Sequence, residues 1–71
     1  MSKLYSSKEI ENVLNIIGFY FLSQKGSHGK FKNIEGDIVI LPMNKKEIPE
    51  GTFRNILKQA GISLKHFKNY L

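Results

Sequence analysis

Apolar residues near the start of the chain recur at the spacing of one helix face. They stand at i, i+3, i+4 and i+7, and they are Ile10, Val13, Leu14 and Ile17. Ser6 and Glu9 have the spacing of a capping box, in which each side chain accepts a hydrogen bond from the other's backbone N–H. Gly18 suits the position after the last turn. The pattern predicts a helix over residues 7–17 with its apolar stripe in the core.

The same spacing returns near the end of the chain. Its members are Phe53, Ile56, Leu57 and Ala60. Pro49-Glu50-Gly51-Thr52 opens this second predicted helix, and Gly61 ends it. Ser63 can cap a last short helix, for which we expect three inward residues. These are Leu64, Phe67 and Leu71.

The segment between the two helices is typical of strands. Residues 19–24 are rich in aromatic side chains, residues 28–33 are basic with one central Phe, and residues 38–41 are β-branched and end at Pro42. Residues 33–37 have hairpin-turn chemistry. The chain therefore predicts an α+β fold with α-β-β-β-α order and a short C-terminal helix. Its three-stranded antiparallel sheet packs against the helices on one face and leaves the other face wet.

Composition narrows the class of protein. The 71 residues suit a single domain, residues 1–71, and the absence of cysteine excludes a disulfide framework or a thiolate metal site. The net charge of +5 favours a polyanionic partner such as nucleic acid, although a charge excess also serves solubility alone. Neither a signal peptide nor a membrane span is recognisable, so we expect a soluble cytoplasmic protein with no membrane partner.

The turn between the first two predicted strands carries the candidate chemistry. Its glycine-flanked histidine, His28, stands next to residues that attract or approach an anion: Lys25, Gly26, Ser27, Lys30 and Lys32. An imidazole both gives and takes a proton near neutral pH. The period of two along a strand places His28, Lys30 and Lys32 on the wet face and Phe31 in the core. The alternative interpretation is that His28, as a histidine in a glycine turn, is only a solvated or hydrogen-bonded surface residue.

Further cations are candidates for contact with a phosphate backbone. Lys45 and Lys46 stand in the polar connection of residues 43–47, and Arg54 lies on the flank of the second predicted helix. For the two lysines, a solvated loop is an equally good interpretation. His66 has no catalytic neighbour in the sequence and is expected to be merely exposed.

The order of elements resembles a double-stranded-RNA-binding domain. A more specific resemblance covers nearly the whole chain and is carried by Ser7–Ile10, Gly18-Phe19, Gln24–Phe31, Pro42-Met43 and Gly51–Ser63. In these stretches the chain resembles the HicA family of RNA-cleaving toxins. It implies the toxin of a type II toxin–antitoxin system, an endoribonuclease (mRNA interferase) with His28 as the catalytic residue. It also implies an mRNA substrate and a HicB-type antitoxin, which we expect to be acidic and to cover the His28 turn.

Two positions depart from the family pattern, and the mechanism stays open to an alternative. Family members commonly have further histidines where this chain has Gly29 and Asn44. If those histidines assist catalysis in other members, this chain lacks that assistance. The sequence shows no set of metal ligands, which predicts a metal-independent reaction without cofactors, with His28 as general acid or base. The alternatives are a non-catalytic basic RNA- or DNA-binding module and a protein-interaction domain.

Overall fold

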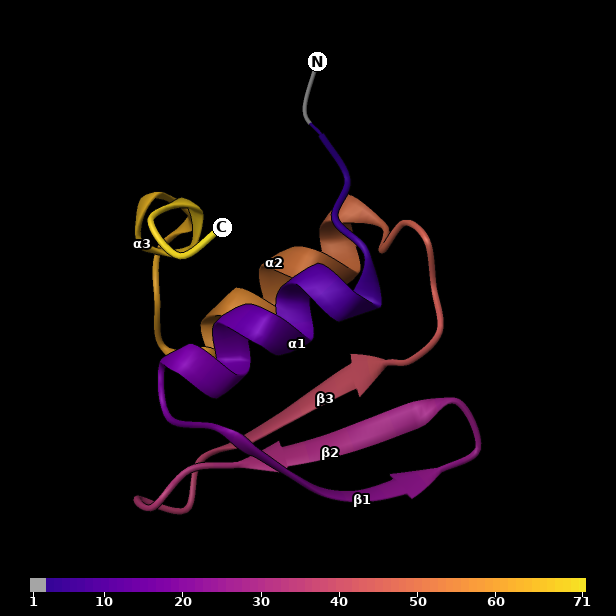
Figure 1. Ribbon diagram of the computed structural model, residues 1–71, viewed down its shortest axis with the longest axis vertical. Helices are drawn as coiled ribbons and strands as arrows, with labels where there is room; N and C mark the ends of the chain where they lie inside the picture. Colours follow the sequence, from indigo (N-terminus) through magenta and orange to yellow (C-terminus); the bar gives the residue numbers. More distant parts are fainter. Residues whose placement is uncertain (1–2) are drawn as a thin grey trace.

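The helices and strands follow one another in the predicted order in the computed structural model, which describes residues 3–71 (Figure 1). Their bounds differ from the prediction by one or two residues. The elements are α1 (Ser7–Ile16), β1 (Tyr20–Lys25), β2 (His28–Lys32), β3 (Ile38–Pro42), α2 (Glu50–Ala60) and α3 (Leu64–Lys68). The predicted α+β class and its likeness to a double-stranded-RNA-binding domain are confirmed.

The three strands form one antiparallel sheet in the order β1-β2-β3, so β2 is paired on both sides. The turn between β2 and β3 is closed by Asn33, whose Oδ1 accepts from the backbone N–H groups of Glu35 (3.1 Å) and Asp37 (2.8 Å). In β1 the register shifts between Phe21 and Ser23, a β-bulge that leaves one extra residue in the edge strand. Short hairpin connections thus place all three strands without a crossover.

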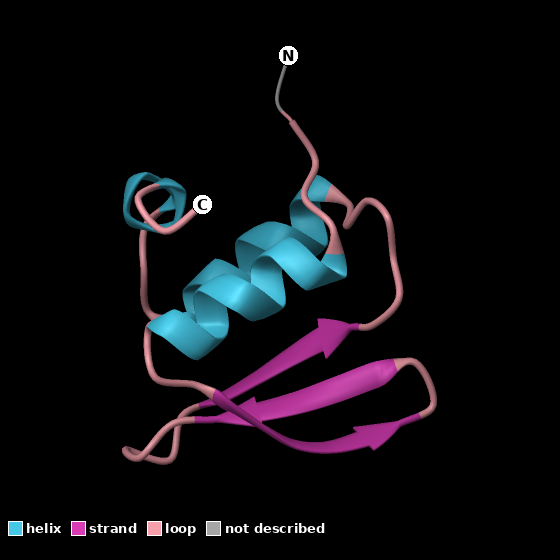
Figure 2. Ribbon diagram, viewed as in Figure 1, coloured by secondary structure: helices cyan, strands magenta, loops and turns pink. Residues whose placement is uncertain are grey.

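Helices α1 and α2 lie side by side over one face of the sheet and leave the other face open (Figure 2). β3 lies nearest to them and β1 farthest away (Figure 1). The core between the layers consists of Tyr5, Ile10, Val13, Leu14, Phe19, Phe31, Val39, Leu41, Ile48, Phe53, Ile56, Leu57 and Phe67. Tyr5 and Ile48 were not predicted to be buried, because neither belongs to a periodic stripe.

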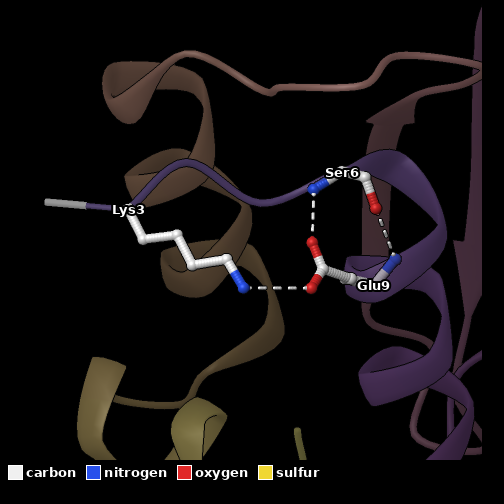
Figure 3. Close-up of polar contacts among 3 residues, drawn as sticks. All are labelled: Lys3, Ser6 and Glu9. Atoms are coloured by element: carbon white, nitrogen blue, oxygen red, sulfur yellow. Dashed lines mark hydrogen bonds and ion pairs between the residues drawn. The ribbon is translucent and has the colours of Figure 1, made fainter.

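The start of α1 is a complete capping box (Figure 3). The Ser6 hydroxyl accepts from the Glu9 backbone N–H at 3.1 Å, and the Glu9 carboxylate accepts from the Ser6 backbone N–H at 2.9 Å. Lys3 Nζ lies 3.4 Å from the other carboxylate oxygen. The hydrogen bond from the Ser6 N–H holds the pKa of Glu9 below its ordinary value, and the charge of Lys3 acts in the same direction. The predicted cap is confirmed.

The prediction for the C-terminal helix was partly wrong. Phe67 is buried at 1% exposure and packs against the rings of Tyr5 and Phe53, whose centroids lie 5.0 and 4.9 Å away. Leu64 and Leu71, however, are 44% and 57% exposed. α3 has only five residues and ends at Lys68, so helical spacing does not extend to Leu71, and Phe67 is the one residue of this helix that is buried.

Candidate active site

The β1–β2 turn is a tight connection in which Lys25 and His28 are paired directly across the two strands. Gly26 adopts φ +59°, a left-handed conformation in which a residue with a Cβ is strained. Gln24 Nε2 donates to the Gly26 carbonyl at 2.9 Å and so supports the turn from within β1. Residues directly opposite each other in an antiparallel pair project from the same face. The imidazole and the Lys25 ammonium group therefore leave the sheet on the same side.

Side chains of β2 alternate strictly between solvent and core. His28 and Lys30 are exposed and Lys32 is half-buried, whereas Gly29 and Phe31 are buried. Residues i and i+2 of a strand lie roughly 7 Å apart, so the imidazole and the two ammonium groups stem from one row about 13 Å long. The predicted division of the strand into a wet basic face and a core face is confirmed. The chemical role of these side chains remains a prediction.

The rows next to β2 on this outer face differ from one another. Lys30 is paired with Ser23 on the β1 side and with Ile40 on the β3 side. Lys32 is paired with Tyr20, whose side chain is 47% exposed. None of the three strands contains an aspartate or a glutamate. His28 consequently has cations and no carboxylate among its strand neighbours, an arrangement that suits an anionic ligand.

The loop after β3 brings Lys45 and Lys46 to the same end of the sheet as His28. Met43 N–H donates to the Ser27 carbonyl at 2.6 Å, which joins this loop to the β1–β2 turn. Both connections lie at one end of the sheet in Figure 1. The Ser7 N–H donates to the Lys45 carbonyl at 2.9 Å, and Ser7 Oγ accepts from the Lys45 N–H at 2.9 Å. These bonds fix the loop backbone and leave both lysines exposed.

Arg54 is not brought to this surface. Its guanidinium forms an i,i+4 ion pair with Glu50 at 2.7 Å and is exposed. It lines a groove between the N-terminal segment, α2 and α3, together with Lys3 and Lys68. This groove belongs to the helical side of the molecule. A role of Arg54 in RNA binding stays a prediction, but the structure does not place it beside the other candidate cations.

The structure shows the surroundings of Gly29 and Asn44, the two positions at which the chain departs from the family pattern. A Cβ on Gly29 would lie 2.9 Å from Met43 Sδ on the inner face, so a side chain at this position would point away from His28. Asn44 adopts φ +59°, a conformation that asparagine tolerates better than most residues with a Cβ. The absence of a histidine at position 29 therefore removes nothing from the face that carries His28.

Three residues that support the site escaped prediction: Ser7, Gln24 and Met43. Ser7 is buried at 4% exposure, and its hydroxyl donates to the Pro42 carbonyl at 2.6 Å as well as accepting from Lys45. The two contacts join residues that are separated by 35 and 38 positions in the sequence, so no local pattern predicts them. Gln24 acts only two residues away, and its amide next to a glycine turn is the one signal that could have been found.

Two further features of residues 3–71 bear on what the site can hold. In this range no three His, Cys, Asp or Glu side chains cluster closely enough to bind a metal ion. None of the helices formed by these residues is long and apolar enough to cross a membrane.

A family model described as "HicA toxin of bacterial toxin-antitoxin" matches residues 7–62 of the 71-residue chain. The matched range begins at the buried Ser7 and includes the whole sheet and α2. It therefore contains every residue of the His28 turn and of the loop that holds it. No curated protein matches the chain significantly.

Proposed function

Because the chain belongs to the HicA toxin family, the toxins of bacterial toxin–antitoxin systems, we propose that it acts as an endoribonuclease, an mRNA interferase, with His28 as its catalytic residue. The observation that carries this proposal is the outer face of β2. There an exposed imidazole stands directly opposite Lys25 and in one row with Lys30 and Lys32. An anionic RNA strand meets cations and a proton-transfer group on the same surface.

RNA supplies its own nucleophile for this reaction. The ribose 2′-oxygen attacks the adjacent phosphorus, a P–O2′ bond forms, and the P–O5′ bond breaks. The 2′-hydroxyl loses its proton to a base, and the departing 5′-oxygen gains one from an acid. His28 acts in one of these two proton transfers, a contribution of about 10² to 10⁴ in rate. The products are a 2′,3′-cyclic phosphate and a 5′-hydroxyl.

The lysines of the outer face position the phosphodiester and offset the negative charge that develops on it. Lys25 is closest in register to His28, and Lys30 and Lys32 extend the track along β2. Lys45 and Lys46 add positive charge at the same end of the sheet through the loop that is bonded to Ser27. Gly26 and Ser27 are exposed in the turn and would lie against the same ligand. The reaction needs no metal ion or cofactor in this proposal.

The direct test is cleavage of a single-stranded RNA by the wild-type protein and by His28→Ala, each with and without chelator. His66→Ala is the matched control, because His66 is also exposed. We expect the wild type and His66→Ala to cut equally well with chelator present, and His28→Ala to lose at least about a hundredfold in rate. The wild-type products should carry 2′,3′-cyclic phosphate ends. Cleavage by His28→Ala at the wild-type rate, or its loss with chelator, would contradict the proposal.

An antitoxin of the HicB type is the proposed protein partner. We place it over the His28 turn, with carboxylates opposite the lysines, because burying these cations unpaired would be costly. Protection of the His28 turn from solvent in the toxin–antitoxin complex is the expected result. A complex in which this turn stays open to solvent and to RNA would contradict the placement.

A non-catalytic RNA- or DNA-binding module is the second candidate. The observation in its favour is that no carboxylate stands on the strands around His28 to assist a second proton transfer. In this case His28 only donates or accepts a hydrogen bond to a phosphate or base. No RNA product would then form at any protein concentration, which separates the two candidates.

A further inference from the structure

The two edges of the sheet are protected to very different degrees. At β3, the Ile40 N–H donates to Gln59 Oε1 of α2 at 3.0 Å, so a side chain takes the place of a neighbouring strand. Pro42 has no N–H, and its carbonyl accepts from Ser7 Oγ at 2.6 Å. The backbone groups of this edge are thus occupied or absent at two of its five residues. A further strand cannot pair along β3 without breaking these bonds.

Among residues 3–71, no side chain bonds to the open edge of β1 as Gln59 bonds to β3. All six residues from Tyr20 to Lys25 are exposed, and the large apolar residues Tyr20, Phe21 and Leu22 are 47%, 48% and 49% exposed. An edge strand presents unpaired N–H and C=O groups on one side, and it usually carries charges that prevent pairing with other chains. β1 has one charge, Lys25, at its very end, and one bulge. In Figure 1 it lies on the side of the sheet farthest from the helices.

We infer that β1 is the docking edge for an extended segment of an acidic protein partner, which adds a fourth strand to the sheet. The occupant is the antitoxin, and in this respect the inference rests on the proposed function. Strand addition of this kind gains affinity from backbone hydrogen bonds and specificity from alternate side chains. Apolar side chains of the added strand would cover the exposed positions Tyr20–Leu22.

The charge of this surface selects the partner. β1 contains no acidic residue and ends at Lys25, and Lys30 lies one strand further in on the same face. Carboxylates on the outer face of an added strand would meet these ammonium groups. A second copy of the chain would instead bring another net charge of +5 and a second Lys25 to the same edge. An acidic segment is favoured over self-association for this reason.

Docking at β1 has a consequence for the candidate catalytic residue. The strand ends at Lys25, which is paired directly with His28. A segment that follows β1 to its end and continues past Lys25 lies over the turn of Gly26 and Ser27. The same strand that provides affinity therefore carries the partner to the imidazole and excludes RNA from it.

Hydrogen exchange of the β1 amides tests this inference in the free toxin and in its complex with the co-expressed antitoxin. We expect exchange of the amides between Phe21 and Gln24 to slow at least about tenfold in the complex. The matched variants are Leu22→Lys on the edge and Ile34→Lys in the β2–β3 turn, where Ile34 is 95% exposed. Leu22→Lys should weaken the complex by about tenfold or more, and Ile34→Lys should leave it unchanged.

Each other outcome overturns the inference in a recognisable way. A complex in which the β1 amides exchange as in the free toxin overturns the docking edge and leaves the proposed RNA cleavage untouched. If the β1 amides become more protected from exchange as the toxin concentration increases in the absence of antitoxin, the occupant of the edge is a second copy of the chain. Absence of any complex overturns this inference together with the proposed antitoxin, whereas the His28→Ala cleavage assay is independent of both.

Discussion

The β1–β2 turn and α3 each carry one histidine among lysines, and both histidines are exposed. His28 has Lys25 opposite it and Lys30 two residues away. His66 lies between Lys65 and Lys68 on a helix of five residues. By local composition the two segments are alike, because each combines an imidazole with nearby ammonium groups. They differ in the contacts that hold the backbone at each histidine in place.

His28 opens the central strand, where it is paired with Lys25 on one side and Pro42 on the other. The carbonyl of the preceding residue, Ser27, accepts from the Met43 N–H. In α3, by contrast, the buried residue is Phe67, and the His66 ring has the Tyr70 ring as a neighbour at 6.1 Å. A reacting group must be held in position by a rigid element. Strand register, more than local charge, therefore distinguishes His28 from His66.

Removal of the buried aromatic ring from the element that carries each histidine, β2 or α3, should have the largest effect. Phe31→Ala and Phe67→Ala each delete a side chain that is at most 1% exposed, at a cost of about 3–5 kcal/mol in the free energy of unfolding. We expect Phe31→Ala to unfold the sheet, because Phe31 lies in the central strand. Phe67→Ala should release α3 and leave the strands folded. Hydrogen exchange by residue separates the two results, and loss of strand protection in Phe67→Ala would remove the distinction between the regions.

Removal of the serine hydroxyl that holds each region in place should have the next largest effect. Ser7→Ala removes the acceptor of the Lys45 N–H and the donor to Pro42 in a buried setting, and we expect a loss of about 1–3 kcal/mol in stability. Ser63→Ala removes the exposed cap of α3, in which the hydroxyl accepts from the His66 N–H at 3.1 Å. Chemical denaturation measures both losses. RNA cleavage should decrease in Ser7→Ala under native conditions and stay unchanged in Ser63→Ala.

Charge reversal of one lysine in each region should change activity by a smaller factor. Lys25→Glu places a carboxylate opposite His28, and we expect cleavage to slow by about tenfold or more because phosphate stabilisation is lost. Lys65→Glu makes the same change in net charge next to His66 and should have little effect. The single-turnover cleavage rate at fixed ionic strength decides this. Equal losses in both variants would mean that net charge, not the position of the charge, governs activity.

The sequence was sufficient for the parts of this comparison that depend on local spacing. Stripes at helical spacing located α1 and α2, and the period of two along β2 placed His28 and Phe31 on opposite faces. Local spacing could not reveal the contacts of Ser7 with Pro42 and Lys45, which join segments more than 30 positions apart. The same limit explains Leu64 and Leu71, because the burial of a five-residue helix depends on its packing partners. It also explains why Arg54 was grouped with the cations of the sheet from the sequence. In the structure Arg54 forms an ion pair with Glu50 on α2.

The helix caps of the two regions should differ in their response to pH, and this is the smallest expected effect. The pKa of Glu9 in the α1 cap is lowered, chiefly by the hydrogen bond from the Ser6 N–H. The carboxylate thus stabilises the fold above pH 4.5, and this contribution is lost as the pH falls further, through the pKa of the folded state. α3 has no acidic residue in its first turn. Its Ser63 cap should therefore not respond to pH in this range.

Glu9→Gln tests the pH effect, because glutamine accepts the same hydrogen bond without titrating. The difference in unfolding free energy between pH 7 and pH 3 should be smaller in the variant than in the wild type. We expect the change to amount to about a few tenths of a kcal/mol, since the side chain is 38% exposed and solvent screens its charge. Identical pH profiles would show that ionisation of Glu9 contributes no measurable stability.

Whether His28 acts chemically on RNA is decided by measuring RNA affinity and single-turnover cleavage in the same two variants, His28→Ala and His66→Ala. We expect both variants to bind a single-stranded RNA with an affinity within about threefold of the wild type, since the cations of the outer face remain. His28→Ala alone should lose about 10² to 10⁴ in cleavage rate. Loss of affinity with no cleavage by the wild type would identify a binding module, and equal cleavage by all three proteins would show that His28 does not act on the RNA.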